Sequence, residues 1–110
     1  MDYRVQYLKD ENGRYVGCIA IREHLAHKGA KSVLVEYRVS TLNPSDTFDK
    51  EVARQLAIGR AVEAPYTVRV TAGANLYEIS QTIMKDIAGD STATSRTRRA
   101  AKSWLRKNTA

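Results

Sequence analysis

Cysteine and long apolar runs are what this sequence of 110 residues most clearly lacks. A single cysteine, Cys18, excludes an intrachain disulfide and agrees with a reducing compartment. No apolar run approaches the ~18 residues of a membrane span, and the first residues lack the basic start and apolar stretch of a signal peptide. We therefore expect a cytoplasmic protein with no membrane partner.

Motifs of known chemistry are missing as well. The chain has no Gly-x-Ser-x-Gly, phosphate-loop or dinucleotide-binding pattern. His24 and His27 supply fewer ligands than a zinc site needs, so we interpret them as part of a solvated loop. Cys18 lies between Gly17 and Ile19 in a strand pattern, which predicts a buried thiol rather than a nucleophile. We expect no catalytic residues, no cofactor and no metal.

Acidic residues are absent from the last twenty positions. The chain has 18 Lys and Arg against 12 Asp and Glu, and six of the cations fall in residues 91–110. Residues 1–90 are therefore neutral, and the net charge of +6 belongs to the tail. This asymmetry indicates a polyanionic partner. We predict a globular domain over residues 1–90 and a basic C-terminal helix or tail over residues 91–110.

The first part of the chain has the pattern of a β-hairpin. Residues 3–8 and 15–22 alternate well enough for two strands. Asn12 and Gly13 between them favour a two-residue turn, because both turn positions adopt positive φ and these residues tolerate it.

Two further strands are predicted from the same alternation of apolar and polar residues. Residues 32–42 place valines and Tyr37 on one side and charged or polar residues such as Glu36 on the other, so one face is expected to be buried. Residues 66–72 form the fourth strand. The order of the strands in the sheet stays open.

A helix is predicted from about Thr47 to Glu63 because its apolar residues have a helical period. The segment Asn43-Pro44-Ser45-Asp46 breaks the preceding strand and offers helix caps, and Ala64-Pro65 ends the helix. We expect Gly59 to permit a close approach to the sheet. The expected buried face consists of Phe48, Val52, Leu56, Ile58, Gly59 and Val62.

A second helix is predicted over roughly residues 76–88. Asn75 and Glu78 have the spacing of a capping box, and Gly89 ends the helix. The resulting order is β-β-β-α-β-α-α. It indicates an α+β fold, an antiparallel sheet of about four strands with two helices on one face and a basic C-terminal helix. The second helix is expected to bury Leu76, Ile79, Ile83, Met84 and Ile87.

The basic tail has two opposite arcs if residues 96–107 are helical. One arc is apolar, and Trp104 on it can pack on the body or stack on a base. The other is a row of like charges, which phosphates stabilise, and the planar fork of arginine suits phosphate. We interpret the tail as a site for DNA or RNA. Its apolar arc is Thr97, Ala100, Ala101, Trp104 and Leu105. The candidate binding residues are Arg96, Arg98, Arg99, Lys102, Trp104, Arg106 and Lys107.

Other interpretations of the charges stay open. A terminal helix often packs its apolar arc on the body and simply exposes its charges to water. A basic open face of the sheet can enter a major groove, although a solvated face is the commoner case. The loop between the second and third strands is a secondary basic candidate, with Arg22, His24, His27, Lys28 and Lys31.

The stretches Asn43-Pro-Ser-Asp-Thr-Phe48 and Ala57-Ile-Gly-Arg60 together resemble a pattern met in short uncharacterised bacteriophage-encoded accessory proteins. The resemblance covers about twenty residues. It implies a small phage or mobile-element protein in the cytoplasm of a bacterial or phage-infected host cell. It transfers no site residues.

Two functions are compatible with these patterns. The first is a small non-enzymatic nucleic-acid-binding protein that uses its arginine-rich C-terminal helix on phosphates. The alternative is a protein that inhibits or adapts a host protein, with the tail on an acidic partner surface and the body supplying an apolar hot spot. A homodimer through a sheet edge or the Trp104 face is left open.

Overall fold

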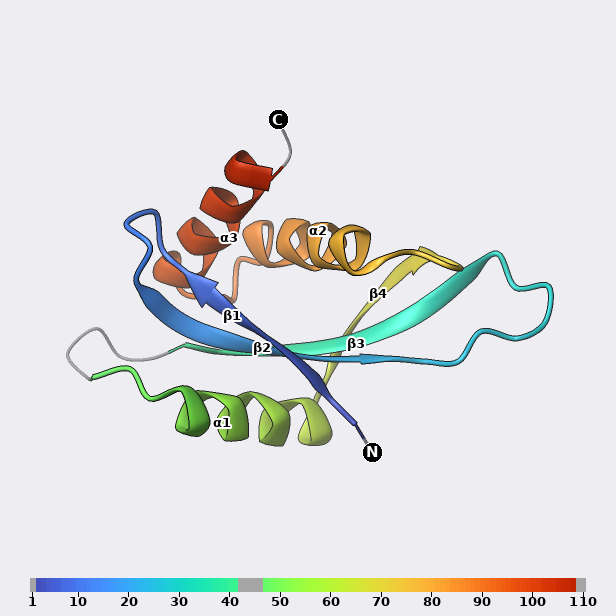
Figure 1. Cartoon of the computed structure of the whole chain (residues 1–110), viewed down its shortest axis with the longest axis horizontal. Helices are drawn as coiled ribbons and strands as arrows, with labels where there is room; N and C mark the ends of the chain where they lie inside the picture. Colours follow the sequence, from blue (N-terminus) through green and yellow to red (C-terminus); the bar gives the residue numbers. More distant parts are fainter. Residues whose placement is uncertain (1, 42–46, 109–110) are drawn as a thin grey trace.

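The computed structural model describes residues 2–41 and 47–108, and a four-stranded antiparallel sheet forms its middle layer (Figure 1). Each strand pairs with its neighbour in the sequence, so the sheet is a meander in the order β1-β2-β3-β4. The α+β class, the element order and the four antiparallel strands are confirmed. The elements are β1 (Arg4–Lys9), β2 (Tyr15–Glu23), β3 (Ser32–Thr41), α1 (Lys50–Glu63), β4 (Tyr66–Thr71), α2 (Leu76–Ala88) and α3 (Ser95–Asn108).

The β1–β2 hairpin is confirmed, but its turn differs from the predicted one. Gly13 has a φ of 81°, whereas no described residue other than glycine has a positive φ, so Asn12 does not. The Asp10 carboxylate accepts hydrogen bonds from the backbone N–H groups of Asn12 and Arg14, at 2.9 and 3.0 Å. Because Asp10 satisfies these amides, the turn needs only one left-handed residue, and Gly13 supplies it.

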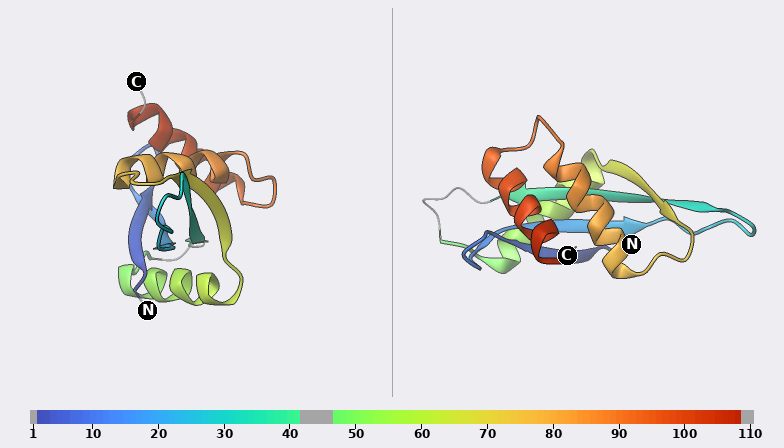
Figure 2. Two further views of the ribbon diagram at one scale, coloured as in Figure 1. Left: turned by 90° about the vertical axis from the view of Figure 1, so that its right-hand side faces the viewer. Right: turned by 90° about the horizontal axis from the view of Figure 1, so that it is seen from above.

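Helices cover both faces of the sheet, α1 on one and α2 with α3 on the other (Figures 1 and 2). The two helices that share a face are thus α2 and α3, and α1 differs from the predicted placement by lying opposite them. The reason is that β2 is apolar on both sides. Cys18 and Ala20 face α1, whereas Ile19 and Ile21 face α2. A strand buried on both faces needs two covering layers.

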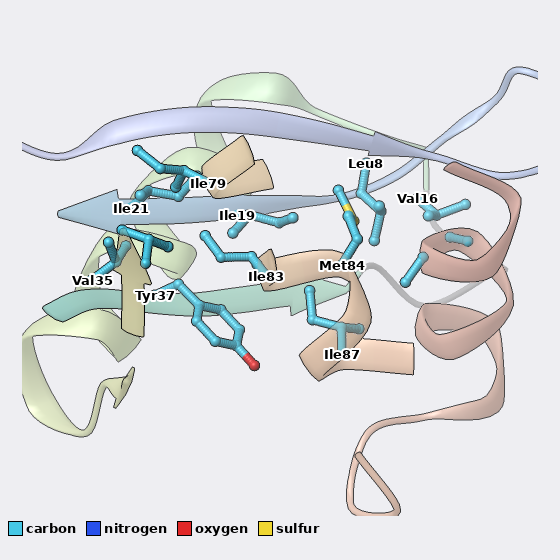
Figure 3. Packing of buried hydrophobic residues seen from close by; sticks show 13 residues of the cluster. Leu8, Val16, Ile19, Ile21, Val35, Tyr37, Ile79, Ile83, Met84 and Ile87 are labelled. Atoms are coloured by element: carbon cyan, nitrogen blue, oxygen red, sulfur yellow. The ribbon is translucent and has the colours of Figure 1, made fainter. Parts of the chain in front are cut away.

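The layer under α2 is built from large side chains. Ile83 and Met84 of α2 pack over Ile19 and Tyr37 of the sheet (Figure 3). The predicted capping box is present: the Asn75 side chain accepts from the Glu78 backbone N–H at 2.8 Å, and the Glu78 carboxylate accepts from the Asn75 backbone N–H at 3.1 Å. Of the predicted buried residues only Leu76 is wrong, because it stands at the first position of α2 and is 57% exposed.

The layer under α1 is built from small side chains. Three alanines at i, i+4 and i+8, which are Ala53, Ala57 and Ala61, face the sheet and are buried. They rest on Cys18 and Ala20 of β2. A stripe of alanines lets the helix backbone lie close to the strands, so the helix leaves little room for larger residues.

The predicted buried face of α1 is therefore largely wrong. Val52, Leu56 and Val62 are 47%, 46% and 64% exposed, whereas Phe48 and Ile58 are half-buried against the alanine layer. Gly59 is exposed too, and a Cβ added there would meet no atom within 4 Å. It does not mediate a close approach to the sheet.

The start of α1 also differs from the prediction. The helix begins at Lys50, and the Asp49 carboxylate caps it by accepting from the backbone N–H groups of Glu51 and Val52. An aspartate in this position satisfies amides that have no partner within the helix. The caps predicted at Asn43–Asp46 lie outside the described residues.

The glycine that does allow a close approach is Gly17 in β2. A Cβ added at Gly17 would lie 2.3 Å from the backbone oxygen of Ser40 on β3. Its neighbour Cys18 is fully buried, and burial raises the pKa of the Cys18 thiol to about 11. The predicted burial of this thiol is confirmed.

Candidate nucleic-acid interface

The apolar arc of α3 belongs to the main core. Ala100 and Ala101 are buried in the same cluster as the large residues of α2, and Trp104 and Leu105 pack against that cluster. The predicted helix and the predicted apolar arc are both confirmed. The solvent side of α3 is thereby fixed, because the opposite side is held by packing.

The beginning of α3 is tied to the sheet by threonine hydroxyls. Thr97 is 3% exposed, and its hydroxyl lies 2.5 Å from that of Thr41 on β3 and 2.8 Å from that of Thr94. The Thr94 hydroxyl also accepts from the Thr97 backbone N–H at 3.2 Å, which is the hydrogen bond of an N-cap. The domain boundary at residue 91 stays a prediction, but removal of α3 would uncover buried alanines and a buried hydroxyl.

Three cations form a row on the solvent side of α3. Arg99, Lys102 and Arg106 are exposed, and spacings of three and four residues place them on one side of the helix. None of them belongs to an ion pair with a carboxylate of the described residues. We call Arg99, Lys102 and Arg106 the α3 cation row.

The remaining predicted cations of α3 lie on its flanks. Arg96 lines a cavity of about 280 Å³ together with Arg99 and the acidic residues Asp10 and Glu11 of the β1–β2 turn. Lys107 donates a hydrogen bond to the backbone oxygen of Glu11 at 3.5 Å. Arg98 is half-buried. Arg96 and Arg98 are thus less open to a polyanion than the α3 cation row, whereas Lys107 is exposed near the end of the helix.

Trp104 packs within the protein. Its ring centroid lies 5.9 Å from that of Tyr77 on α2, and the side chain is half-buried against the main core. The Tyr77 hydroxyl donates to the backbone oxygen of Asn108, so the end of α3 is bound to α2 as well. Of the two predicted roles, packing is the one that this geometry favours.

The secondary basic loop lies at the far end of the sheet from α3 (Figures 1 and 2). Its charge is partly neutralised, because Arg22 pairs with Glu36 at 3.1 Å and His24 contacts the same carboxylate. His27, Lys28 and Lys31 are exposed. The structure therefore does not join the two predicted basic sites into one surface.

The predicted alternative of a basic open sheet face is not supported, because both faces of the sheet are covered by helices (Figure 2). Two arginines that the sequence analysis did not combine, Arg38 of β3 and Arg60 of α1, line a common cavity. No sequence spacing relates them, since they meet only through the packing of α1 on β3.

The chain matches no protein-family model, no curated protein and no solved structure. Across the described ranges, no helix combines the length and the apolarity that crossing a bilayer requires. The geometry of the α3 cation row is therefore the main guide to function.

Proposed function

We propose that this chain is a small non-enzymatic nucleic-acid-binding protein whose α3 contacts phosphates. The observation that supports this is the α3 cation row. Arg99, Lys102 and Arg106 are exposed and have no carboxylate partner among the described residues. Residues 1–90 carry equal numbers of acidic and basic residues, so these charges are not balanced by an excess of acid elsewhere.

A row of this kind binds through release of counterions from the phosphates. Each neutralised phosphate of duplex DNA contributes about −0.9 to the slope of log affinity against log salt concentration. Phosphate contacts position a protein but carry little sequence information. We therefore expect binding that is strongly salt-dependent and weakly sequence-specific. Trp104 contributes by packing α3 against the core.

The test compares two triple variants with the same change of charge. One replaces Arg99, Lys102 and Arg106 by glutamine. The matched control replaces three exposed cations on other elements, Arg54, Arg69 and Lys85. Fluorescence anisotropy with labelled duplex DNA, single-stranded DNA and RNA at several salt concentrations measures affinity. The α3 variant is expected to make the duplex salt slope shallower by about 2.7, and the control to change it little.

Point variants are preferable to deletion of residues 91–110, because α3 contributes to the core. The fluorescence of Trp104, the single tryptophan of the chain, reports whether α3 stays packed in each variant. The proposal is refuted if wild-type protein binds none of the three nucleic acids, or if both triple variants weaken binding equally.

A second candidate function is favoured by the exposed apolar residues of α1. Val52, Leu56 and Val62 are large apolar side chains left in solvent on one helix, and exposed apolar surface of this kind is typical of protein interaction sites. Under this alternative, a host protein with an acidic surface contacts α3 while α1 supplies apolar contact. Leu56→Glu would then abolish capture of a stoichiometric partner at moderate salt and leave nucleic-acid affinity unchanged. The phage or mobile-element origin rests on the resemblance and is part of this proposal.

A further inference from the structure

A cavity of about 280 Å³ opens beside the end of β3. β4 pairs with β3 from Ser32 to Tyr37, so the residues of β3 from 38 onward have no partner strand on that edge. Helix α1 approaches the open edge from one face of the sheet, and the start of α3 approaches it from the other. The polar residues of the lining include Arg38, Thr41, Arg60, Tyr66, Thr94 and Thr97.

Two arginines from separate elements, Arg38 of β3 and Arg60 of α1, line the cavity. Arg38 lies 4.4 Å from the ring centroid of Tyr66 and donates to the backbone oxygen of Ala64 at 2.5 Å. Arg60 donates to the backbone oxygen of Val39 at 3.3 Å. Neither arginine takes part in an ion pair among residues 2–41 and 47–108. Each guanidinium has five N–H donors, so donors remain for a ligand.

Hydroxyl groups also line the cavity. Thr41, Thr97 and Thr94 form a chain of hydroxyl contacts at 2.5 and 2.8 Å. Hydroxyl hydrogens rotate, so this chain can turn a donor toward a bound oxygen. Asp90, an acidic residue of the lining, accepts two hydrogen bonds from Thr92, and these lower its pKa. Asp90 therefore stays ionised, and its charge opposes a bound anion, so the two arginines have to outweigh it.

From this arrangement we infer that the cavity binds a small phosphate ester. The phosphoryl group lies between Arg38 and Arg60, because paired planar guanidinium groups suit its oxygens. The organic part lies along Tyr66 and the apolar side chain of Val39. The volume is close to the lower end, about 300 Å³, of the range for small-ligand sites, and far exceeds the roughly 30 Å³ of one water. A ligand of mononucleotide or sugar-phosphate size fits this space.

The inference is independent of the proposed function, since the α3 cation row does not line this cavity. Isothermal titration calorimetry of the full chain tests it with adenosine 5′-monophosphate, inorganic phosphate and adenosine. We expect the monophosphate to bind, inorganic phosphate to bind more weakly, and adenosine not to bind measurably. Equal binding of adenosine and its monophosphate, or no binding of any probe, overturns the inference.

Variants locate the binding. Arg60→Gln changes an exposed residue of α1, and we expect roughly tenfold weaker binding of the monophosphate because a charge-assisted hydrogen bond is lost. Arg38→Lys keeps the charge but loses the planar contact with Tyr66, and should weaken binding similarly. The control is Arg69→Gln, an exposed arginine of β4 outside the lining.

Two outcomes separate this site from α3. The triple glutamine variant of Arg99, Lys102 and Arg106 should bind the monophosphate as the wild type does. If that variant loses the monophosphate while Arg60→Gln keeps it, the phosphate binds α3 and the inference is wrong. Thermal unfolding of each variant shows that the fold is retained; if Arg38→Lys does not fold, Arg60→Gln decides alone.

Discussion

On one face of the sheet α1 packs through a stripe of its own alanines, whereas on the other face α2 and α3 cover isoleucines, a methionine and a tyrosine. The alanine layer covers the strands closely and leaves the larger residues of α1 in solvent. The opposite layer buries its large residues and holds α3 in place. The α1 side of the molecule thus exposes several apolar side chains among charged ones, whereas α3 buries its apolar arc and exposes cations.

The largest expected effect is on the layer of large residues. Ile83→Ala removes a fully buried side chain of α2 and should lower the free energy of unfolding by about 3 kcal/mol, through lost burial and a residual cavity. The matched change in the alanine layer is Ile58→Ala, where the side chain is only half-buried and the expected cost is about 1 kcal/mol. Urea unfolding measures both. Equal costs would contradict the contrast between the layers.

The next prediction concerns two adjacent residues of α1. Ala57→Leu inserts a large side chain between α1 and the strands, and should cost about 2 kcal/mol through overpacking. Leu56→Ala changes an exposed position, and its effect should stay within about 0.5 kcal/mol. The same unfolding measurement applies. A larger loss for Leu56→Ala than for Ala57→Leu would show that the other side of α1 packs on the sheet.

The contrast between the helices also shows which parts of the fold could be predicted from the sequence. The capping box of Asn75 and Glu78 and the period of α2 are local, so both were predicted correctly. For α1 the sequence contains two competing stripes, one of valine and leucine and one of alanine. The alanine stripe packs because the strand face beneath it carries Cys18, Ala20 and Ser40, which are distant in sequence.

The candidate sites also divide into features that are local in the sequence and features that depend on distant residues. The charged and apolar arcs of α3 could be predicted because charge and helical period lie within one segment. The division of its cations was not predictable, since Arg96 and Arg98 become half-buried only through the packing of the folded chain. The cavity between Arg38 and Arg60 likewise exists only because α1 lies on β3.

The smallest expected effect lies in the alanine layer and depends on pH. Burial raises the pKa of Cys18 from its ordinary value of 9.0 to about 11. Above about pH 9 the unfolded thiol loses its proton while the folded thiol keeps it, so the unfolded state binds fewer protons and stability falls as the pH rises. The stability associated with the protonated Cys18 thiol is fully present below about pH 9 and is lost as the pH rises toward about 11. The Cys18→Ala variant lacks this pH-dependent part of the stability.

The free energy of unfolding of the wild type should therefore fall, relative to Cys18→Ala, by roughly 1 kcal/mol between about pH 8 and about pH 10. Urea unfolding of both proteins at a series of pH values measures this difference, and titrations common to both proteins cancel. Tyr37, whose pKa is raised by burial and then by its hydrogen bond to Asp86, is one such group. If the free energies of unfolding of the two proteins changed in parallel with pH, the thiol would ionise as readily in the folded protein as in the unfolded one. The packing of α1 would then not exclude water from Cys18.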